Sequence, residues 1–250
     1  MNRSFLTYFI CIAWICLIGY ASNAIETANV LGLSNSPHAE KAAILDQFLA
    51  FIQQIDRLSA DFMQENNNVS TGQIMTGSGI LRIQRPDRFE WVYSSQPRNH
   101  IVCNGSLIIM ILPDVQQVMM DSADSQEILW SPLSLLTDAR WMQRMQVETL
   151  TPDSTDVAET ASFKLTPRKQ EDAFENIIVR IPLHLPATSF EITVFDGAGN
   201  QNRIRFTGLR QTEPEYDIDA PSIPVGFEVT DFQGNPRNPE AVERKQDHED

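Results

Sequence analysis

The segment Gly79–Tyr93 has the sequence GILRIQRPDRFEWVY, and it is the stretch that decides the fold. Its aliphatic and aromatic side chains and one arginine fall on odd-numbered positions: Leu81, Ile83, Arg85, Phe89, Trp91 and Tyr93. Side chains of an extended chain alternate between two sides, so these residues share one face. Pro86 and Asp87 between the two halves are turn formers. The segment therefore predicts two antiparallel strands joined by a tight turn.

The apolar face of this predicted hairpin has two interpretations. In one, it is half of a packed core and Arg85 is solvated at a strand end. In the other, it lines a binding surface for an apolar ligand. A guanidinium at the edge of an apolar face is costly to bury without hydrogen-bond partners, so the partners of Arg85 distinguish the two.

The N-terminus has the features of a secretory signal peptide. Arg3 precedes an apolar run from Phe5 to Tyr20, and small residues follow up to Ala24. We expect cleavage after Ala24, which makes residues 1–24 a signal peptide and the mature protein an exported one. An uncleaved membrane anchor is the alternative.

Charge and cysteine content narrow the class of protein. The formal net charge of −14 argues against a nucleic-acid partner and against anionic membrane surfaces, because both require basic patches. Cys11 and Cys16 lie in the expected signal peptide, which leaves Cys103 and no internal disulfide. Stability must then come from a hydrophobic core, and the remaining length suits one domain.

The expected mature chain begins with a leader and a helix. Residues 25–36 are small and polar, and we expect a flexible leader there. Ser36 and the proline that follows it are typical of a helix start, and helical spacing of apolar residues predicts a helix over about Pro37–Arg57. Alternation at residues 60–64 predicts the first strand, and Asn66–Gly77 is predicted as a polar loop.

Many short strands follow. Asn104-Gly105 between two apolar runs predicts a hairpin, and Asp196–Asn200 predicts another turn. Ser131-Pro132 begins a second predicted helix that extends to about Met142. Further strands are expected at Asn99–Cys103, Ser106–Leu112, Val115–Asp121, Met145–Leu150, Ser162–Thr166, Glu175–Ile181, Phe190–Phe195 and Arg203–Gly208. Tyr216–Ile218 and Phe227–Phe232 are expected to close the sheet, and residues 236–250 to form a disordered charged tail.

These elements predict one domain over residues 37–235 that is mostly β with two helices. An antiparallel sheet must cover its apolar face, and two helices are few for a sheet of this width. We therefore expect part of that face to line a cavity rather than a packed core.

The usual catalytic and metal-binding motifs are missing from the sequence. The histidines are scattered without an i, i+4 pair or a cysteine cluster, and Gly77-Ser78-Gly79 lacks the spacing of a nucleophile elbow. Cys103 is interpreted as a small buried hydrophobic residue rather than a nucleophile. We expect no metal, no cofactor and no enzyme activity.

Several motifs occur together along the chain: Phe62-x-Gln64, the run Gly79-x-Leu81-x-Ile83-x-Arg85-Pro86-x-x-Phe89-x-Trp91, Asn104-Gly105, Gln117-Val118 and Ser131-Pro132-x-x-Leu135-Leu136. In order and spacing they resemble the periplasmic outer-membrane lipoprotein carrier family (LolA), over about Ala39–Phe232. The Arg-Pro-x-x-Phe-x-Trp run is the most specific part, and the C-terminal third matches only loosely.

The resemblance implies an incomplete antiparallel β-barrel, or half-barrel, around a hydrophobic cavity, with helices as a lid. It implies that Arg85 latches the closed lid through hydrogen bonds to the lid backbone, that Phe89 lies at the rim, and that Trp91 lies inside. The expected lipid-binding residues are Leu81, Ile83, Phe89, Trp91 and Tyr93 on the sheet and Leu133, Leu135 and Leu136 on the lid.

The resemblance also implies a route for the cargo. A monomeric carrier in the periplasm would accept lipoprotein acyl chains from an inner-membrane ABC transporter complex and deliver them to an outer-membrane acceptor lipoprotein. Two alternatives stay open: a carrier of another acylated lipid or glycolipid, and a non-catalytic periplasmic module that senses lipids. The identity of the bound cargo distinguishes a carrier of another lipid from a lipoprotein carrier. A lipid-sensing module would bind a regulatory partner and show no transfer activity.

Overall fold

The computed structural model describes residues 37–95, 97–123, 143–150, 160–169, 174–184, 187–212 and 216–238. The predicted signal peptide, leader and second helix, and residues 239–250 of the predicted tail, lie outside these ranges. Within them, one α-helix is followed by twelve strands and one short 3-10 helix. No helix among the described residues is long and apolar enough to cross a membrane.

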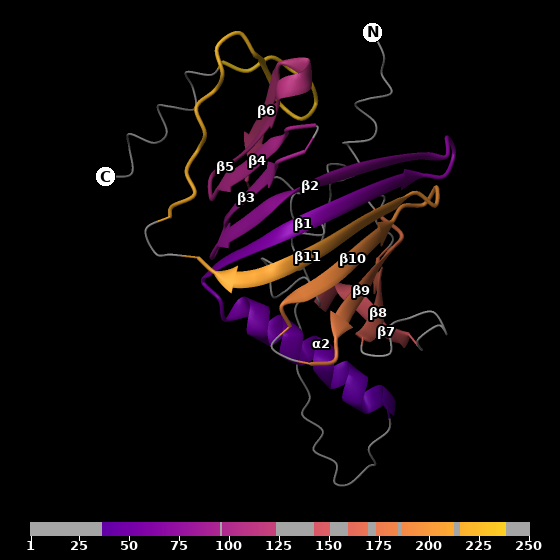
Figure 1. The fold of residues 1–250 in the computed structure, drawn as a ribbon. Helices are drawn as coiled ribbons and strands as arrows, with labels where there is room; N and C mark the ends of the chain where they lie inside the picture. Colours follow the sequence, from indigo (N-terminus) through magenta and orange to yellow (C-terminus); the bar gives the residue numbers. More distant parts are fainter. Residues whose placement is uncertain are drawn as a thin grey trace.

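The elements follow one another as a helix and a series of mostly antiparallel strands (Figure 1). They are α2 (Pro37–Gln53), β1 (Arg57–Asn68), β2 (Gln73–Gln84), β3 (Arg88–Tyr93), β4 (His100–Asn104), β5 (Leu107–Leu112), η1 (Pro113–Val115), β6 (Gln117–Ser122), β7 (Met145–Leu150), β8 (Thr160–Pro167), β9 (Asn176–Pro182), β10 (Ser189–Phe195), β11 (Gln201–Gln211) and β12 (Glu228–Thr230).

The strands form a single sheet that does not close. Its order is β12-β6-β5-β4-β3-β2-β1-β11-β10-β9-β8-β7, so β12 and β7 are the two edges. All neighbours pair antiparallel except β12 and β6, which pair parallel. Figure 1 shows the sheet curved, with α2 beside β7 to β10. The predicted incomplete antiparallel barrel is confirmed. Two helices were expected to cover the sheet, and α2 is the one that lies among the described residues.

The hairpin predicted from Gly79–Tyr93 is confirmed. Leu81 pairs with Trp91, and Ile83 pairs with Phe89, across β2 and β3. The hairpin at Asn104-Gly105 is confirmed as well, because Gly105 has a φ of 95° and the Asn104 Oδ1 accepts hydrogen bonds from the backbone of Ser106 and Leu107. Turn formers therefore mark both strand connections correctly: Pro86 and Asp87 in the first hairpin, and Asn104-Gly105 in the second.

The predicted polar loop at Asn66–Gly77 is wrong. β1 and β2 pair without interruption from Arg57 with Gln84 to Asn68 with Gln73, so the polar residues belong to a long hairpin. The tight turn at its tip is held by Asn68, whose Oδ1 accepts from the backbone N–H of Thr71. Polar side chains do not prevent strand pairing, because the backbone makes the ladder and both sides of an exposed hairpin tip can face water.

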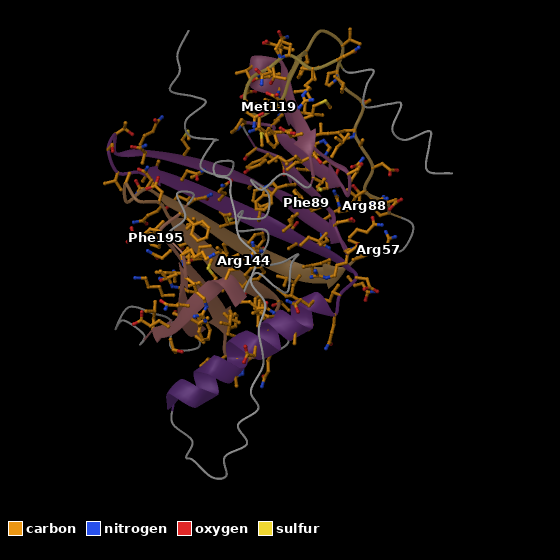
Figure 2. The ribbon with its side chains drawn as sticks, turned by 180° about the vertical axis from the view of Figure 1, so that it is seen from behind. Arg57, Arg88, Phe89, Met119, Arg144 and Phe195 are labelled. Atoms are coloured by element: carbon orange, nitrogen blue, oxygen red, sulfur yellow. The ribbon has the colours of Figure 1, made fainter. Side chains whose placement is uncertain are left out.

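The C-terminal segment does not close the sheet as predicted. Tyr216–Ile218 is not a strand, and within Phe227–Phe232 only Glu228–Thr230 pairs, parallel to β6. The reason is that Tyr216–Asp219 is held on the outside of β1 to β3, where the Arg57 guanidinium donates to the Tyr216 carbonyl and the Arg88 guanidinium donates to the Ile218 carbonyl. Figure 2 shows Arg57 and Arg88 at the same end of the sheet.

The sheet has an inner and an outer face. We call inner the face that carries Leu81, Trp91 and their neighbours, and its buried side chains form the main core with one side of α2. The helix contributes residues at helical spacing: Leu45, Phe48, Leu49 and Ile52. On the outer face of β5 and β6 a second core forms under the C-terminal segment, from Ile109, Ile111, Val118, Met120 and Val229.

Candidate functional site: the inner face and its helix

The hairpin side chains predicted to bind lipid lie together on the inner face. Leu81, Ile83, Phe89, Trp91 and Tyr93 are all buried there and belong to the main core. Phe89, which the resemblance places at a rim, is opposite Ile83 and Cys103 in the ladder. The residue pattern alone identified this face correctly, because a period of two assigns every second side chain to one side.

A continuous row of aromatic rings crosses the inner face. From α2, Phe48 contacts Phe190 of β10 at 5.0 Å between ring centroids, and Phe190 stacks on Phe206 of β11 at 4.6 Å. The row continues through Trp91 to Phe62, with centroids 5.9 Å and 4.6 Å apart in turn. Rings at these separations pack favourably, and together they give the sheet a broad apolar surface. Sequence reasoning missed Phe48, Phe190 and Phe206, although the last two fall on the buried positions of alternating strands.

Two glycines make room for this row. A Cβ on Gly79 would lie 1.8 Å from the Val92 carbonyl oxygen and 2.9 Å from the Phe62 ring, and one on Gly77 would lie 2.9 Å from the Tyr93 ring. Gly77 and Gly79 therefore have a packing role. Both lie within β2, and the neighbouring aromatic rings and backbone require them to have no side chain.

A short polar network lies among the rings. The Tyr93 hydroxyl donates to the Gln64 Oε1, and the Gln64 Nε2 donates to the Asn202 Oδ1 at 2.9 Å. Burial raises the pKa of Tyr93 well above its ordinary value, so the hydroxyl keeps its proton. Trp91 is 5% exposed, and its hydrogen bond to the Tyr93 side chain opposes part of the rise in the pKa of Tyr93.

Arg85 lies where β2 has ended and meets the end of α2. Its Nε donates to the Ile55 carbonyl at 3.1 Å, and its NH2 group donates to the Ile52 carbonyl at 3.0 Å. The last carbonyls of a helix have no partner within the helix, and a forked guanidinium can satisfy two acceptors at once. Burial lowers the pKa of Arg85 and the charge of Asp56 opposes that shift, so the side chain is partly withdrawn from water. Arg85 is therefore not a solvated strand end.

The structure brings part of the predicted site together. Arg85 and the hairpin side chains contact α2. The lid leucines were expected on the second predicted helix, not on α2. Leu133, Leu135 and Leu136 lie outside the described residues. Sequence reasoning missed the role of the helix end, although the helix itself was predicted over Pro37–Arg57 and is found over Pro37–Gln53.

The outer face behind the hairpin carries a charged cluster, which we define as Arg82, Glu90, His100 and Tyr216. The Glu90 carboxylate accepts from Arg82 at 2.7 Å, from the Tyr216 hydroxyl, and pairs with the His100 ring at 2.9 Å. Burial alone would raise the pKa of Glu90, but these hydrogen bonds outweigh it and lower the pKa to about 2. The cluster fastens the C-terminal segment to the back of the hairpin.

The described residues show no cluster that could bind a metal ion, and Cys103 is buried. No group of three or more histidine, cysteine or acidic residues in these ranges is placed to hold a metal ion. Cys103 is buried, its Sγ donates to the Asp87 carbonyl at 3.2 Å, and burial raises the pKa of the thiol. The interpretation of Cys103 as a small buried residue is confirmed.

Comparison with known proteins assigns the chain to a family. The family described as outer membrane lipoprotein carrier protein LolA matches residues 53–220. The outer-membrane lipoprotein carrier protein of Alkalilimnicola ehrlichii is 28% identical over 217 residues, which are 84% of this chain and 95% of that relative. The protein of the same name from Haemophilus influenzae is 28% identical over 201 residues, which are 76% of this chain and 91% of the relative.

A solved structure of a LolA-superfamily protein from Nitrosomonas europaea is also similar. It is 9% identical, with a TM-score of 0.38, and the match covers 69% of this chain and 94% of that one. The assignment rests on the sequence match, which spans the strands that carry the aromatic row and the position of Arg85. The chain belongs to the LolA outer-membrane lipoprotein carrier family.

Proposed function

We propose that this protein is a periplasmic carrier that binds the acyl chains of lipoproteins on its inner face. The observation that carries the proposal is the open, curved sheet whose inner face holds a row of aromatic rings and is partly covered by a helix fastened through Arg85. Its relatives are named lipoprotein carriers, which supports the same cargo.

The energetics favour an apolar cargo held by a surface that can open. Each methylene moved from water to an apolar surface contributes about 0.8 kcal/mol, so several acyl chains would be held very tightly by a rigid pocket. A carrier must release its cargo, and it can do so if part of the binding free energy is used to open the protein. The hydrogen bonds of Arg85 to the end of α2 stabilise the closed arrangement, and cargo would have to displace them.

The route is the part of the proposal that rests most on family membership. The carrier accepts its cargo from an inner-membrane ABC transporter complex, crosses the periplasm as a monomer, and delivers it to an outer-membrane acceptor lipoprotein. The residues that contact the chains are Leu81, Ile83, Phe89, Trp91 and Tyr93, with Leu133, Leu135 and Leu136 from the lid. The carrier performs no covalent chemistry.

Native mass spectrometry of the protein purified from the periplasm of its host, followed by organic extraction, tests the proposal. A lipoprotein bound one to one supports it. A bound glycolipid or free fatty acid would replace it with a carrier of another acylated lipid. A protein that carries no lipid, and that binds no synthetic lipopeptide when one is added, would contradict carriage altogether.

A further inference from the structure

The inner face changes from apolar to polar along β1. Its inner positions are, in order, Leu58, Ala60, Phe62 and Gln64, all of them buried, and the half-buried Asn66 follows. Figure 1 shows that β1 begins beside the end of α2 and leads away from it to the tip of the β1–β2 hairpin. The central strands are therefore apolar near the helix end and polar toward the hairpin tip.

The polar side chains toward the tip belong to one hydrogen-bonded network. The Tyr93 hydroxyl donates to the Gln64 Oε1, and the Gln64 Nε2 donates to the Asn202 Oδ1 at 2.9 Å. Trp91 has a hydrogen bond with the Tyr93 side chain as well. A primary amide has two N–H donors and an oxygen with two lone pairs, so Gln64 and Asn202 can each bind more than one partner. The network holds its own members in place and can also bind a polar group laid against it.

The apolar part of this face is as long as a fatty acyl chain. A strand rises about 3.3 Å per residue, so the path along β1 from Gln64 back to Leu58 is about 20 Å long. Carbon–carbon single bonds of about 1.5 Å, arranged in a zigzag, make an extended chain of sixteen carbons about 20 Å long. An acyl chain can therefore lie along β1 with one end beside Gln64 and the other beside the end of α2.

The two ends of an acyl chain need the two kinds of surroundings that this face provides. Hydrocarbon is stabilised by apolar contacts, whereas an ester or amide carbonyl is costly to bury without a hydrogen-bond donor. The amide groups of Gln64 and Asn202 lower that cost toward the hairpin tip. At the helix end, Arg85 already donates to the Ile52 and Ile55 carbonyls.

Resting on the carrier function proposed above, we propose that acylated cargo binds the inner face in one direction. The ester and amide groups at the head of the chains lie at Gln64 and Asn202, and the hydrocarbon extends along β1 toward α2. The part of the cargo that is not lipid then leaves the inner face at the tip of the β1–β2 hairpin, away from the helix end that Arg85 holds.

Photo-crosslinking of two synthetic lipopeptides to the full-length mature protein measures this direction. Both carry two palmitoyl chains on the same peptide. The head probe has a diazirine on the residue next to the acylated one, and the tail probe has it at the last carbon of one chain. Mass spectrometry should find that the head probe labels residues 64–77 and 200–204 about fivefold more than the tail probe does, and that the tail probe favours residues 45–60 and 81–85. The reverse pattern, or equal labelling of both regions by both probes, would overturn the proposal.

Two substitutions test the polar side chains themselves. Asn202→Leu and Gln64→Met keep the size of the side chain and remove its amide, so each should weaken lipopeptide binding about threefold to tenfold, which corresponds to one hydrogen bond. Each should also reduce labelling by the head probe at the tip. Asn202 is half-buried, so its replacement provides a test that does not depend on the stability of Gln64→Met.

Gln201→Leu is the matched control. Gln201 precedes Asn202 in β11 and lies on the opposite face of the sheet, because side chains of a strand alternate. It should change neither the affinity nor the labelling pattern. Asn202→Leu and Gln64→Met proteins that both behave like Gln201→Leu would overturn the role of the two amides.

The outcomes distinguish this inference from the carrier function. Labelling that excess unlabelled lipopeptide suppresses, but that has no fixed direction or the reverse one, overturns the direction and leaves carriage standing. A natural protein that neither probe labels in a way that unlabelled lipopeptide suppresses overturns the carrier function, and the direction of binding with it.

Discussion

At the scale of single residues, Arg85 and Gly79 show how the hairpin meets the rest of the molecule. Arg85 uses its forked guanidinium to bind carbonyls at the end of α2, which precede it by 30 and 33 positions. Gly79 allows the backbone of β3 and the ring of Phe62 to approach β2. One residue fastens the helix, and the other lets the aromatic row pack.

Arg85→Leu should bind cargo and release it poorly. Loss of two charge-assisted hydrogen bonds should lower the free energy of unfolding by about 1–3 kcal/mol, since the Ile52 and Ile55 carbonyls lose their donor. The closed, empty state would then be less favoured, and transfer of lipopeptide to acceptor vesicles should slow by about fivefold to tenfold. Arg85→Lys keeps the charge without the fork and should be intermediate. If Arg85→Leu transferred lipopeptide at the natural rate, Arg85 would have no role in keeping the empty carrier closed.

Gly79→Ala should destabilise the protein by about 2–4 kcal/mol, because the added methyl would overlap the Val92 carbonyl and force the strands apart. Gly197→Ala is the matched control, since nothing lies within 4 Å of its added methyl and the substitution should change stability by less than about 0.5 kcal/mol. Urea denaturation of both variants measures the difference. Equal stabilities would mean that β2 and β3 can separate at no cost.

At the scale of elements, the hairpin of β2 and β3 is held on both faces. Its inner face packs on the aromatic row, and its outer face carries the cluster of Arg82, Glu90, His100 and Tyr216. The same cluster fastens the segment after β11, because Tyr216 also stacks against Arg82, with the guanidinium carbon 4.8 Å from the ring centroid. A change in the charge of Glu90 therefore acts on two elements together.

The stability of the fold should fall in acid because of Glu90. Its pKa is about 2 in the folded protein and near 4.5 ordinarily, so the unfolded chain binds a proton at higher pH than the folded one. The contribution of the ionised Glu90 to the free energy of unfolding is complete above about pH 4.5 and is lost as the pH falls toward 2. Glu90→Gln should remove about 1–2 kcal/mol at pH 7, allowing for solvent screening, and should flatten the stability curve across this window.

Thermal melts from pH 7 to pH 2 measure the effect of Glu90→Gln. Glu228→Gln, at an exposed position of β12, is the control and should keep the acid sensitivity of the natural protein. A variant at position 90 that loses stability with acid as steeply as the natural protein would assign the effect to other carboxylates.

At the scale of the whole molecule, one open sheet supports two cores on opposite faces. The inner core includes α2 and the aromatic row, and the outer core lies between β5, β6 and the C-terminal segment. The inner face is the one proposed to bind cargo. The outer core can therefore stabilise the sheet while side chains of the inner face replace contacts with α2 by contacts with cargo. This division suits a carrier, because it separates the stability of the sheet from the occupancy of its concave side.

Val229→Asp tests whether the outer core supports the whole sheet. Val229 is 8% exposed in β12, and a carboxylate there should cost about 3 kcal/mol or more. Val225→Asp is the same substitution at a position of the same segment that is 102% exposed, and it should change stability by less than about 0.5 kcal/mol. Urea denaturation gives both values, and similar stabilities would show that the outer core is dispensable.

The sequence by itself determined the local structure. Alternation at Leu81–Tyr93 assigned each hairpin side chain to a face, and Asn104-Gly105 marked a turn, because side-chain period and backbone φ are properties of a few neighbouring residues. It also identified Arg85 as the residue whose partners distinguish a packed core from a binding surface, because a buried guanidinium requires hydrogen-bond partners.

Only the tertiary structure decided which distant groups meet. The carbonyls that bind Arg85, the Phe62 ring beside Gly79, and the segment that covers the outer face all come from outside the hairpin. Their approach depends on strand order, on the curvature of the sheet and on the side from which α2 packs. The polar residues at the end of β1 also have a distant partner, because Asn66 and Asn67 pair with Asn202 and Gln201 of β11 as well as with β2.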